Sequence, residues 1–590
     1  MSSADGRYPR LASRGPLRSP HALLLGVLVV LLGCAAPPSA PSTTGSTSPT
    51  TAPARIKTIT AALALPILGM SGLSISGAAS DYVELHSNGL ATTDSRGHPI
   101  PRIASELPTL ENGTIRLLPD GRMTTEWRLR PDVTWHDGTP FTSRDVAFGF
   151  RVQADRELAF PAADRSAVSR IEAVEPTDAH TVLIRWRAPY YLAGSLGNRL
   201  LFPLPAHILA SSYETGDKQL FLTLPYWTNE YVHAGAFRLA RFEQGVGATF
   251  EAYEAYFLGR PKVDRVIIRE ILDTNASHAA VLVGDIDVTI EVFEGEGASN
   301  LQDQWEAAGR GRVSSTPGAL NYAMVQLAPD LASPGELLDP RIRRALYLSL
   351  DRIELTSLGW GGRPAPWGEA RGLYPITNPL HAYVGDNLAN SASDPSRARQ
   401  AFADAGWTPG PDGLLVSSGG ARLGAVEIRV ASNRVARAAV VADMWRRVGV
   451  DTTIAPTSGA QQQDRQFRQS APGVQITSSG YEDAGFAKYD GNEQPTARTG
   501  YSGANLGHYD NPRTTELIER FRVTLNEPER GQLVKQVADL VAQDLPLLPF
   551  FHNPQYVTVS RGVRALDDID GARALITGGY AREAHLWDKD

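Results

Sequence analysis

The stretch from Trp127 to Phe150, WRLRPDVTWHDGTPFTSRDVAFGF, constrains the fold of this chain more than any other segment. Apolar residues stand at near-alternate positions over residues 127–135, which predicts a strand with one buried face. Pro131 marks a break in that strand, because proline has no amide N–H to donate. Residues 136–138, His-Asp-Gly, have turn chemistry, since glycine tolerates positive φ and an aspartate side chain can accept from the backbone two residues on. We therefore expect a strand that leads into a tight turn.

A helix is predicted directly after this turn. Thr142 is a good N-cap, and Asp145 three residues later can accept a hydrogen bond from the backbone of the cap as a short capping box. A carboxylate in the first turn also interacts favourably with the helix dipole. Apolar residues then follow at helical spacing, namely Val146, Ala147, Phe150 and Ala154.

The same rules predict elements elsewhere in the chain. Residues 56–79 are apolar but interrupted by proline and glycine, which favours a buried strand followed by a loop. Residues 171–175 and 181–186 alternate in polarity around a turn and predict two strands. A capped amphipathic helix is expected from Asp339, and Gly284 is a plausible C-cap.

Residues 127–150, the signature stretch, also resemble a known family pattern. LRP followed by xVxWHDGxPFTxxDVxFxF is similar to the signature of family 5 of the bacterial extracellular solute-binding proteins, which includes the oligopeptide-, dipeptide- and nickel-binding subunits of ABC importers. Further segments resemble the family in the same order along the chain. They include 256–264 (YFLGRPKVD), 339–352 (DPRIRRALYLSLDR), 394–407 (DPSRARQAFADAGW) and 545–551 (LPLLPFF).

The resemblance implies a mixed α/β fold of the class II periplasmic-binding type, with two large lobes around a central cleft and a smaller third lobe. Two chain crossings between the large lobes are expected, near residues 312–318 and 546–551. Length agrees, since 590 residues are too many for one ordinary core. The implied boundaries are residues 56–110, 232–313 and 550–590 for lobe I, 111–231 for the peripheral lobe, and 314–549 for lobe II.

The N-terminus has the anatomy of an export signal. An arginine-rich start precedes an apolar run over residues 22–32, which is too short to span a bilayer comfortably. Cys34, the sole cysteine, follows Leu-Leu-Gly in a pattern that resembles a bacterial lipobox. We expect residues 1–33 to be a lipoprotein signal peptide and Cys34 to be acylated; a buried free thiol or a plain signal peptide are the alternatives. Residues 34–55, rich in Ser, Thr and Pro, are expected to form a disordered tether.

Composition and motifs argue against other classes of protein. The formal net charge is −7, whereas nucleic-acid binding calls for a basic surface. HExxH, GxSxG, P-loop and GxGxxG-helix motifs do not occur in the sequence. Its histidines lack metal-typical spacing, and a single cysteine excludes a Cys-rich site. We therefore expect neither catalytic residues, nor a metal, nor a cofactor.

Ligand contacts are implied by the resemblance alone. Residues 473–483 take the place of a strand followed by the family's gWxaD segment, in which the aspartate of peptide-binding members meets the amino terminus of the ligand. Asp483 is the nearest match, Glu482 is a rival for the same role, and Tyr481 replaces the tryptophan. An ordinary solvated loop acid, and aromatic residues that belong to the core, are the alternatives. The other predicted contacts are Asn321, Tyr322, Trp360 and Trp227.

These observations lead to one functional hypothesis. We expect a monomeric, lipid-anchored receptor outside the cytoplasm that captures a peptide or another small solute between two lobes. It would deliver this solute to the permease and ATPase complex of an ABC importer. A secreted hydrolase with a site assembled by folding and a sensory ligand-binding module are the alternatives.

Overall fold

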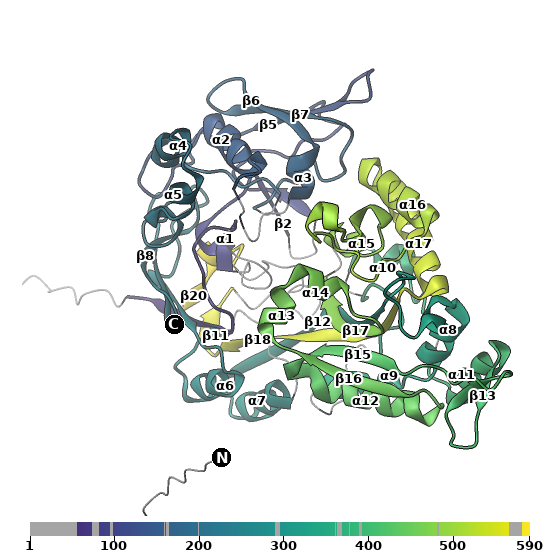
Figure 1. The fold of residues 1–590 in the computed structure, drawn as a ribbon. Coiled ribbons are helices and arrows are strands. Elements are labelled where there is room, and N and C mark those ends of the chain that lie inside the picture. The colour runs from purple at the N-terminus through teal and green to yellow at the C-terminus, as the bar shows by residue number, and fades with distance from the viewer. Residues whose placement is uncertain are drawn as a thin grey trace, which may run out of the picture. The chain divides into compact units, whose positions relative to one another are not determined.

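A ten-stranded mixed sheet runs through the fold in the order β16-β15-β17-β12-β18-β11-β1-β10-β9-β8 (Figure 1). The structure described is a computed structural model. The predicted signal peptide, Cys34 and the tether lie outside the described residues. These are 56–73, 82–94, 98–158, 160, 165–198, 200–289, 296–359, 362, 369–376, 378–388, 392–480, 483–565 and 581–590.

One side of the sheet is built around β1 (Thr58–Leu63), which confirms the buried strand expected in this apolar segment. β1 pairs in parallel with both β10 and β11. β9 continues the sheet antiparallel to β10, and β8 pairs antiparallel with β9. The bounds of these strands are β8 Phe237–Glu243, β9 Gly247–Ala252, β10 Arg265–Glu270 and β11 Val288–Thr289.

The other side contains three parallel strands. β15 (Val426–Ala431) lies between β16 (Thr452–Thr457) and β17 (Val474–Ser479), and it is parallel to both. β17 then pairs antiparallel with β12. Successive residues of β15 are mostly apolar and buried, as expected for a parallel strand that is covered on both faces.

Two long strands connect the two sides. β12 (Gly311–Val325) and β18 (Leu547–Ser560) are antiparallel along nearly their whole length, with a register shift between Pro317 and Leu320. β12 pairs with β17 only from Leu320 onward, and β18 pairs with β11 only at Val559. The middle of this ribbon, at the register shift, therefore lies between the two sides. The segments expected to cross between the lobes fall on β12 and on β18 with the residue before it.

A separate four-stranded antiparallel sheet, β4-β5-β7-β6, contains the start of the signature stretch. Its β5 ends at Arg128, so the strand predicted to run to Trp135 is shorter than expected, because Pro131 cannot donate to a neighbouring strand. The two alternating strands predicted after the signature are present as β6 and β7. The bounds are β4 Ile115–Leu117, β5 Met123–Arg128, β6 Ile171–Pro176 and β7 Thr181–Trp186.

The turn and the capped helix of the signature are confirmed. Gly138 has φ +87°, and its N–H donates to the carbonyl of Trp135 at 2.8 Å. α2 covers Ser143–Ala154, and the Asp145 carboxylate accepts from the N–H of Thr142 at 2.8 Å. The buried face includes Val146 but is rotated from the predicted one, because Ala154 is exposed while positions 148, 149 and 152 are buried.

His136 ties this turn to the segment that returns to the large sheet. Its N–H donates to the carbonyl of His233 at 2.8 Å, and its Nδ1 accepts from the N–H of His233 at 3.3 Å. Both rings are buried, which lowers the pKa of His136 to about 4 and that of His233 to about 3. The signature is thus linked to this returning segment by hydrogen bonds between two buried, neutral histidines.

The helix ends predicted from capping residues are also confirmed. Asp339 caps α8 by accepting a backbone N–H, and Gly284 ends α6 with φ +85°. Asp394, which was not predicted as a cap, caps α11 in the same way. The bounds of the longer helices are α4 Ala206–Glu214, α6 Thr274–Val283, α7 Glu296–Ala307, α8 Pro340–Leu348, α9 Arg352–Gly359, α11 Pro395–Asp404, α12 Val435–Arg447, α16 Pro512–Val523 and α17 Glu527–Asp544.

Shorter elements connect these parts. The short α-helices are α1 Val83–His86, α3 Arg165–Arg170, α5 Lys218–Leu222, α10 His381–Val384, α13 Gly459–Gln463, α14 Arg465–Gln469 and α15 Asp483–Ala487. The 3-10 turns are η2 Pro225–Trp227, η3 Gly335–Leu338, η5 Ser432–Arg434, η6 Gly491–Glu493, η7 Ala497–Thr499 and η8 Ala584–Leu586. Short paired strands are β2 Ala91–Thr93, β3 Pro99–Pro101, β13 Trp407–Pro409, β14 Leu415–Ser417, β19 Val563–Arg564 and β20 Asp588–Lys589.

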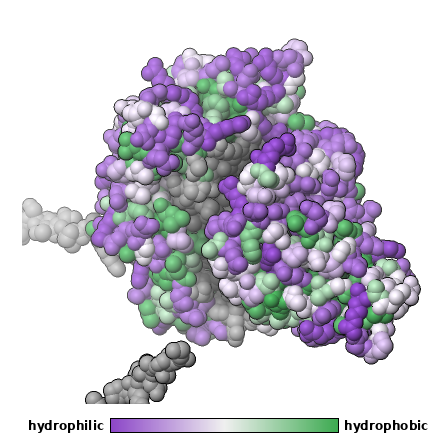
Figure 2. Space-filling model, viewed as in Figure 1, coloured by the Kyte–Doolittle hydropathy of each residue, from purple (hydrophilic) through white to green (hydrophobic). Residues whose placement is uncertain are grey.

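Buried apolar residues gather in three main clusters, around β1, around the four-stranded sheet, and around β12 with β15 to β17. On the face shown in Figure 2, hydrophilic residues prevail and hydrophobic ones are scattered in small groups. Within the described part of the chain, none of the helices combines the length and the apolar character needed to cross a membrane. The lobe boundaries stay a prediction.

Candidate binding site

The strand directions bring two sets of carboxyl ends toward the same place. β1, β10 and β11 run in the direction of β12, whereas β15, β16 and β17 run against it. Both sets therefore end facing the middle of the β12–β18 ribbon. Open α/β sheets bind ligands outside the carboxyl ends of their strands. The ribbon and the strand ends at Ala431, Thr457 and Ser479 thus define the candidate site.

Two predicted residues lie on this ribbon. Asn321 and Tyr322 are on β12, opposite Ser478 and Thr477 of β17. Asn321 is fully buried; its Nδ2 donates to Oδ1 of Asn553 at 3.2 Å, and its own Oδ1 has no hydrogen-bond partner among the described residues. Tyr322 is buried on the other face of the strand, and its hydroxyl is hydrogen-bonded to Ser479.

The acidic segment, residues 481–483, follows β17 in the chain. Tyr481 and Glu482 lie outside the described residues, as does Trp360, and Asp483 begins α15. The strand that leads into this segment pairs with the strand that holds Asn321 and Tyr322. The structure therefore places the end of β17, four residues before Asp483, beside Asn321 and Tyr322. Their contacts with a ligand stay a prediction.

Trp227 has a different environment. It is buried among aromatic rings, with Phe160, Phe221 and Tyr226 at centroid distances of 4.9 to 5.5 Å. Its indole N–H donates to the carbonyl of Phe221 at 2.6 Å. The structure thus places Trp227 in the hydrophobic cluster around β1, and its role as a ligand wall stays a prediction.

Lys488 is a candidate that sequence reasoning missed. It follows α15, and its Nζ donates to Oγ of Ser479 at 2.6 Å. The same Nζ lies 5.4 Å from the ring centroid of Tyr322 and 5.1 Å from that of Tyr489. Although the residue keeps some exposed surface, desolvation of its ammonium group lowers the pKa to about 7. A lone lysine in a polar segment gives no sequence signal for such a position.

A second missed feature joins the four-stranded sheet to α16 and α17. The N–H of Tyr191 donates to the carbonyl of Arg522 at 3.0 Å, and its ring lies 4.6 Å from that of Phe521. The guanidinium of Arg530 lies over the Tyr191 ring at 5.3 Å. These contacts connect the predicted peripheral lobe to predicted lobe II.

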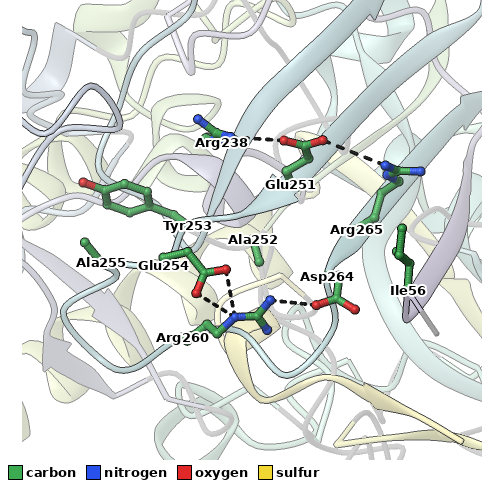
Figure 3. Close-up of a pocket in the computed structure, with 10 residues that line it drawn as sticks. All are labelled: Ile56, Arg238, Glu251, Ala252, Tyr253, Glu254, Ala255, Arg260, Asp264 and Arg265. Atoms are coloured by element: carbon green, nitrogen blue, oxygen red, sulfur yellow. Dashed lines mark hydrogen bonds and ion pairs between the residues drawn. The ribbon is translucent and has the colours of Figure 1, made fainter. Parts of the chain in front are cut away.

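A pocket of about 490 Å³ on β9 and β10 offers less for recognition (Figure 3). Its charged side chains neutralise one another in two groups, which the dashed lines in Figure 3 connect. The pairs are Arg238 with Glu251 at 3.2 Å, Arg265 with Glu251 at 3.9 Å, Arg260 with Glu254 at 2.8 Å and Arg260 with Asp264 at 2.7 Å.

Metal ligands do not gather in the part of the chain that the structure describes. Groups of three or more His, Cys, Asp or Glu side chains with metal-binding geometry are absent from these residues. Buried histidines near the signature instead form hydrogen bonds with the backbone.

Known proteins with a similar sequence cover different shares of the chain. Oligopeptide-binding protein AppA of Bacillus subtilis is 27% identical over 317 residues, which is 51% of this chain and 52% of that protein. Di/tripeptide-binding protein 2 of Pseudomonas aeruginosa is 23% identical over 499 residues, which is 78% of this chain and 85% of that protein. A group of Brucella proteins is 27% identical over 286 residues and is matched over 47% of its own length, so the chain spans about half of these relatives.

Solved structures establish the fold. The oligopeptide-binding protein of Thermus thermophilus, complexed with a pentapeptide, has a TM-score of 0.69 at 22% identity, with 90% of this chain and 96% of that chain covered. NikZ of Campylobacter jejuni, in complex with Ni(L-His), also has a TM-score of 0.69, at 20% identity and with 90% and 99% covered. The predicted fold class, mixed α/β of the class II periplasmic-binding type, is confirmed.

The family predicted from the signature stretch is confirmed as well. Residues 100–486 match the family described as "Bacterial extracellular solute-binding proteins, family 5 Middle". This match includes the signature, the peripheral sheet, β12 and β17. The chain therefore belongs to family 5 of the bacterial extracellular solute-binding proteins.

Proposed function

We propose that this protein is the solute receptor of an ABC importer and that it holds a peptide, or a small solute of similar chemistry, between its two large lobes. The observation that carries the proposal is the convergence of the carboxyl ends of both strand sets on the β12–β18 ribbon. Relatives named for oligopeptides and for di- and tripeptides support the choice of a peptide. The family is one of binding proteins, in agreement with the prediction that the chain is not an enzyme.

Binding requires no chemistry on the solute. The two lobes would close around it by bending at the ribbon, where the register shift between Pro317 and Leu320 interrupts regular pairing. The Tyr191 contacts with α16 and α17 would form as the peripheral lobe meets lobe II. Closure would be the state that the permease recognises.

We assign the recognition of a free amino group to the acidic segment. Asp483, with Glu482 as a rival, would pair with an α-ammonium group through a charge-assisted hydrogen bond. Tyr481, Tyr322 and Trp360 would supply aromatic surface. The buried Oδ1 of Asn321 would accept from the solute or from a water held beside it.

The anchor belongs to the proposal too. Cys34 would carry the lipid, with the signal peptide removed, and residues 35–54 would act as a tether to the membrane. A tether of this length would extend roughly 25 Å as a flexible coil. Such an anchor would hold the receptor near the permease and ATPase complex on the extracytoplasmic side.

A thermal-shift screen tests the proposed function. The purified chain is heated with peptides of two to five residues, sugars and metal chelates, each in turn. A peptide at a hundredfold excess over its Kd stabilises the native state by about 2.7 kcal/mol, so the melting temperature should rise. The same samples are then analysed by mass spectrometry. Conversion of a stabilising peptide to shorter products would favour the secreted hydrolase.

A further inference from the structure

Lys488 has an ammonium group that its described surroundings do not neutralise. It contacts the hydroxyl of Ser479 and the faces of two tyrosine rings. Among the side chains that the structure describes, which do not include those of Glu482 and Asp483, no carboxylate forms an ion pair with Lys488. The nearest buried acid along the chain is Asp490, and its carboxylate is already ion-paired with Arg522 at 2.5 Å. A desolvated cation of this kind is costly unless a partner anion arrives.

The position of this ammonium group agrees with a role in binding. Ser479 is the last residue of β17, so Lys488 Nζ lies at the carboxyl edge that faces the ribbon. A notch whose lining includes Tyr322, Met324, Lys488 and Tyr489 has a volume of about 10 Å³. That volume admits roughly one water-sized group. The notch therefore has room for one carboxylate oxygen of a solute, whereas the rest of the solute would lie outside it.

We propose that Lys488 recognises a carboxylate of the bound solute and thereby selects peptides with a free carboxyl terminus. This inference rests on the proposed function and adds an anion requirement to it. The ammonium group would donate to the carboxylate while it keeps its hydrogen bond to Ser479 and its contacts with the two tyrosine rings. The lowered pKa of free Lys488, about 7, agrees with a cation that awaits its partner.

Proton uptake follows from this arrangement. A carboxylate beside Lys488 raises the pKa of the ammonium group toward its ordinary value, because an opposite charge favours the charged form. At pH 8 most of the free receptor would have a neutral Lys488, and the bound receptor a charged one. Lys488 should then add roughly one proton per bound peptide to the uptake. The α-ammonium group of the peptide also titrates near pH 8, so the contribution of Lys488 is the difference in proton uptake between wild type and a Lys488 variant. A lysine that only supports the fold would leave this difference at zero.

The test compares two mixtures of tripeptides with identical random sequences, one with free carboxyl termini and one with carboxyl-terminal amides. Wild type, Lys488→Met and the control Lys535→Met are titrated with both by calorimetry at pH 8, in two buffers of different ionisation enthalpy. Methionine keeps the apolar stem of Lys488, and Lys535 is an exposed residue of α17 paired with Asp539. Wild type and control should bind the free-acid mixture about tenfold more tightly or better, since a charge-assisted hydrogen bond is at stake.

The outcomes separate the two proposals. Lys488→Met should bind both mixtures alike and take up roughly one proton less per peptide than wild type. Its melting temperature without peptide should equal or exceed that of wild type because a desolvated charge is gone. Equal binding of acids and amides by wild type, or equal proton uptake by wild type and Lys488→Met, would overturn the carboxylate role and leave the receptor function standing. Binding of neither mixture would overturn the proposed peptide receptor and this inference with it. A variant that melts below wild type but keeps its preference for acids would show that Lys488 is structural.

Discussion

Replacing Tyr191 with alanine should weaken solute binding while the chain stays folded. The side chain joins the peripheral lobe to α16 and α17 through the ring of Phe521, 4.6 Å away, and the guanidinium of Arg530, 5.3 Å away. An aromatic pair contributes about 0.5–1.5 kcal/mol and an exposed cation–π contact about 0.5–1 kcal/mol. Their loss would cost the closed conformation about 1–2.5 kcal/mol. If the open conformation lacks these contacts, the whole cost appears in binding, a roughly 5- to 70-fold rise in Kd.

Tyr213→Ala provides a matched control for this variant. Tyr213 has ring contacts with Phe148 and Phe221 and holds Lys218 over its face at 4.2 Å, all on the side of the molecule that contains α2, α4 and α5. Its loss should lower the melting temperature and leave Kd unchanged. Calorimetric titration with a peptide from the thermal-shift screen measures both variants. Wild-type affinity in Tyr191→Ala, or an equal loss in Tyr213→Ala, would refute the closure argument.

Three further predictions concern stability and anchoring. Burial lowers the pKa of His136 to about 4 and of His233 to about 3, so below pH 6.5 the unfolded chain binds more protons than the folded chain. The free energy of unfolding, measured in urea, should therefore fall from pH 7 to pH 5 by up to about 1.4 kcal/mol per pH unit for each ring. A flat profile would contradict this. Asp490→Asn should cost about 1.5–3 kcal/mol in the same assay, because buried Arg522 loses the fully buried carboxylate at 2.5 Å and keeps the more exposed Glu519 at 2.6 Å. A loss below about 0.5 kcal/mol would show that the buried pair is dispensable. Cys34→Ser should move the protein from membranes to the soluble fraction, and unchanged retention would remove the lipid assignment.

Local chemistry allowed much of the fold to be predicted. The strand, turn and capped helix of the signature depend on glycine at positive φ and on the pairing of Thr142 with Asp145, which are interactions between neighbours in sequence. The same holds for the helix that begins at Asp339. Where Pro131 removed a donor, the strand ended earlier than the apolar pattern suggested.

The candidate site was less predictable because its contacts join distant segments. Asn321 and Tyr322 were found through the family resemblance, and the pairing of β12 with β17 brings them to the edge that precedes Asp483. Nothing in the letters around Lys488 indicates that its ammonium group lies between two tyrosine rings. Trp227 shows the converse, since an aromatic residue beside a turn has the same sequence pattern in a core as in a ligand wall.

Native mass spectrometry tests the central claim most directly. The purified chain is incubated with the free-acid tripeptide mixture, exchanged into volatile buffer and analysed intact. A solute receptor should carry one peptide per chain, and the peptides released by denaturation should have the masses of intact tripeptides. A chain that carries no peptide, or that releases dipeptides and amino acids in their place, would contradict the account.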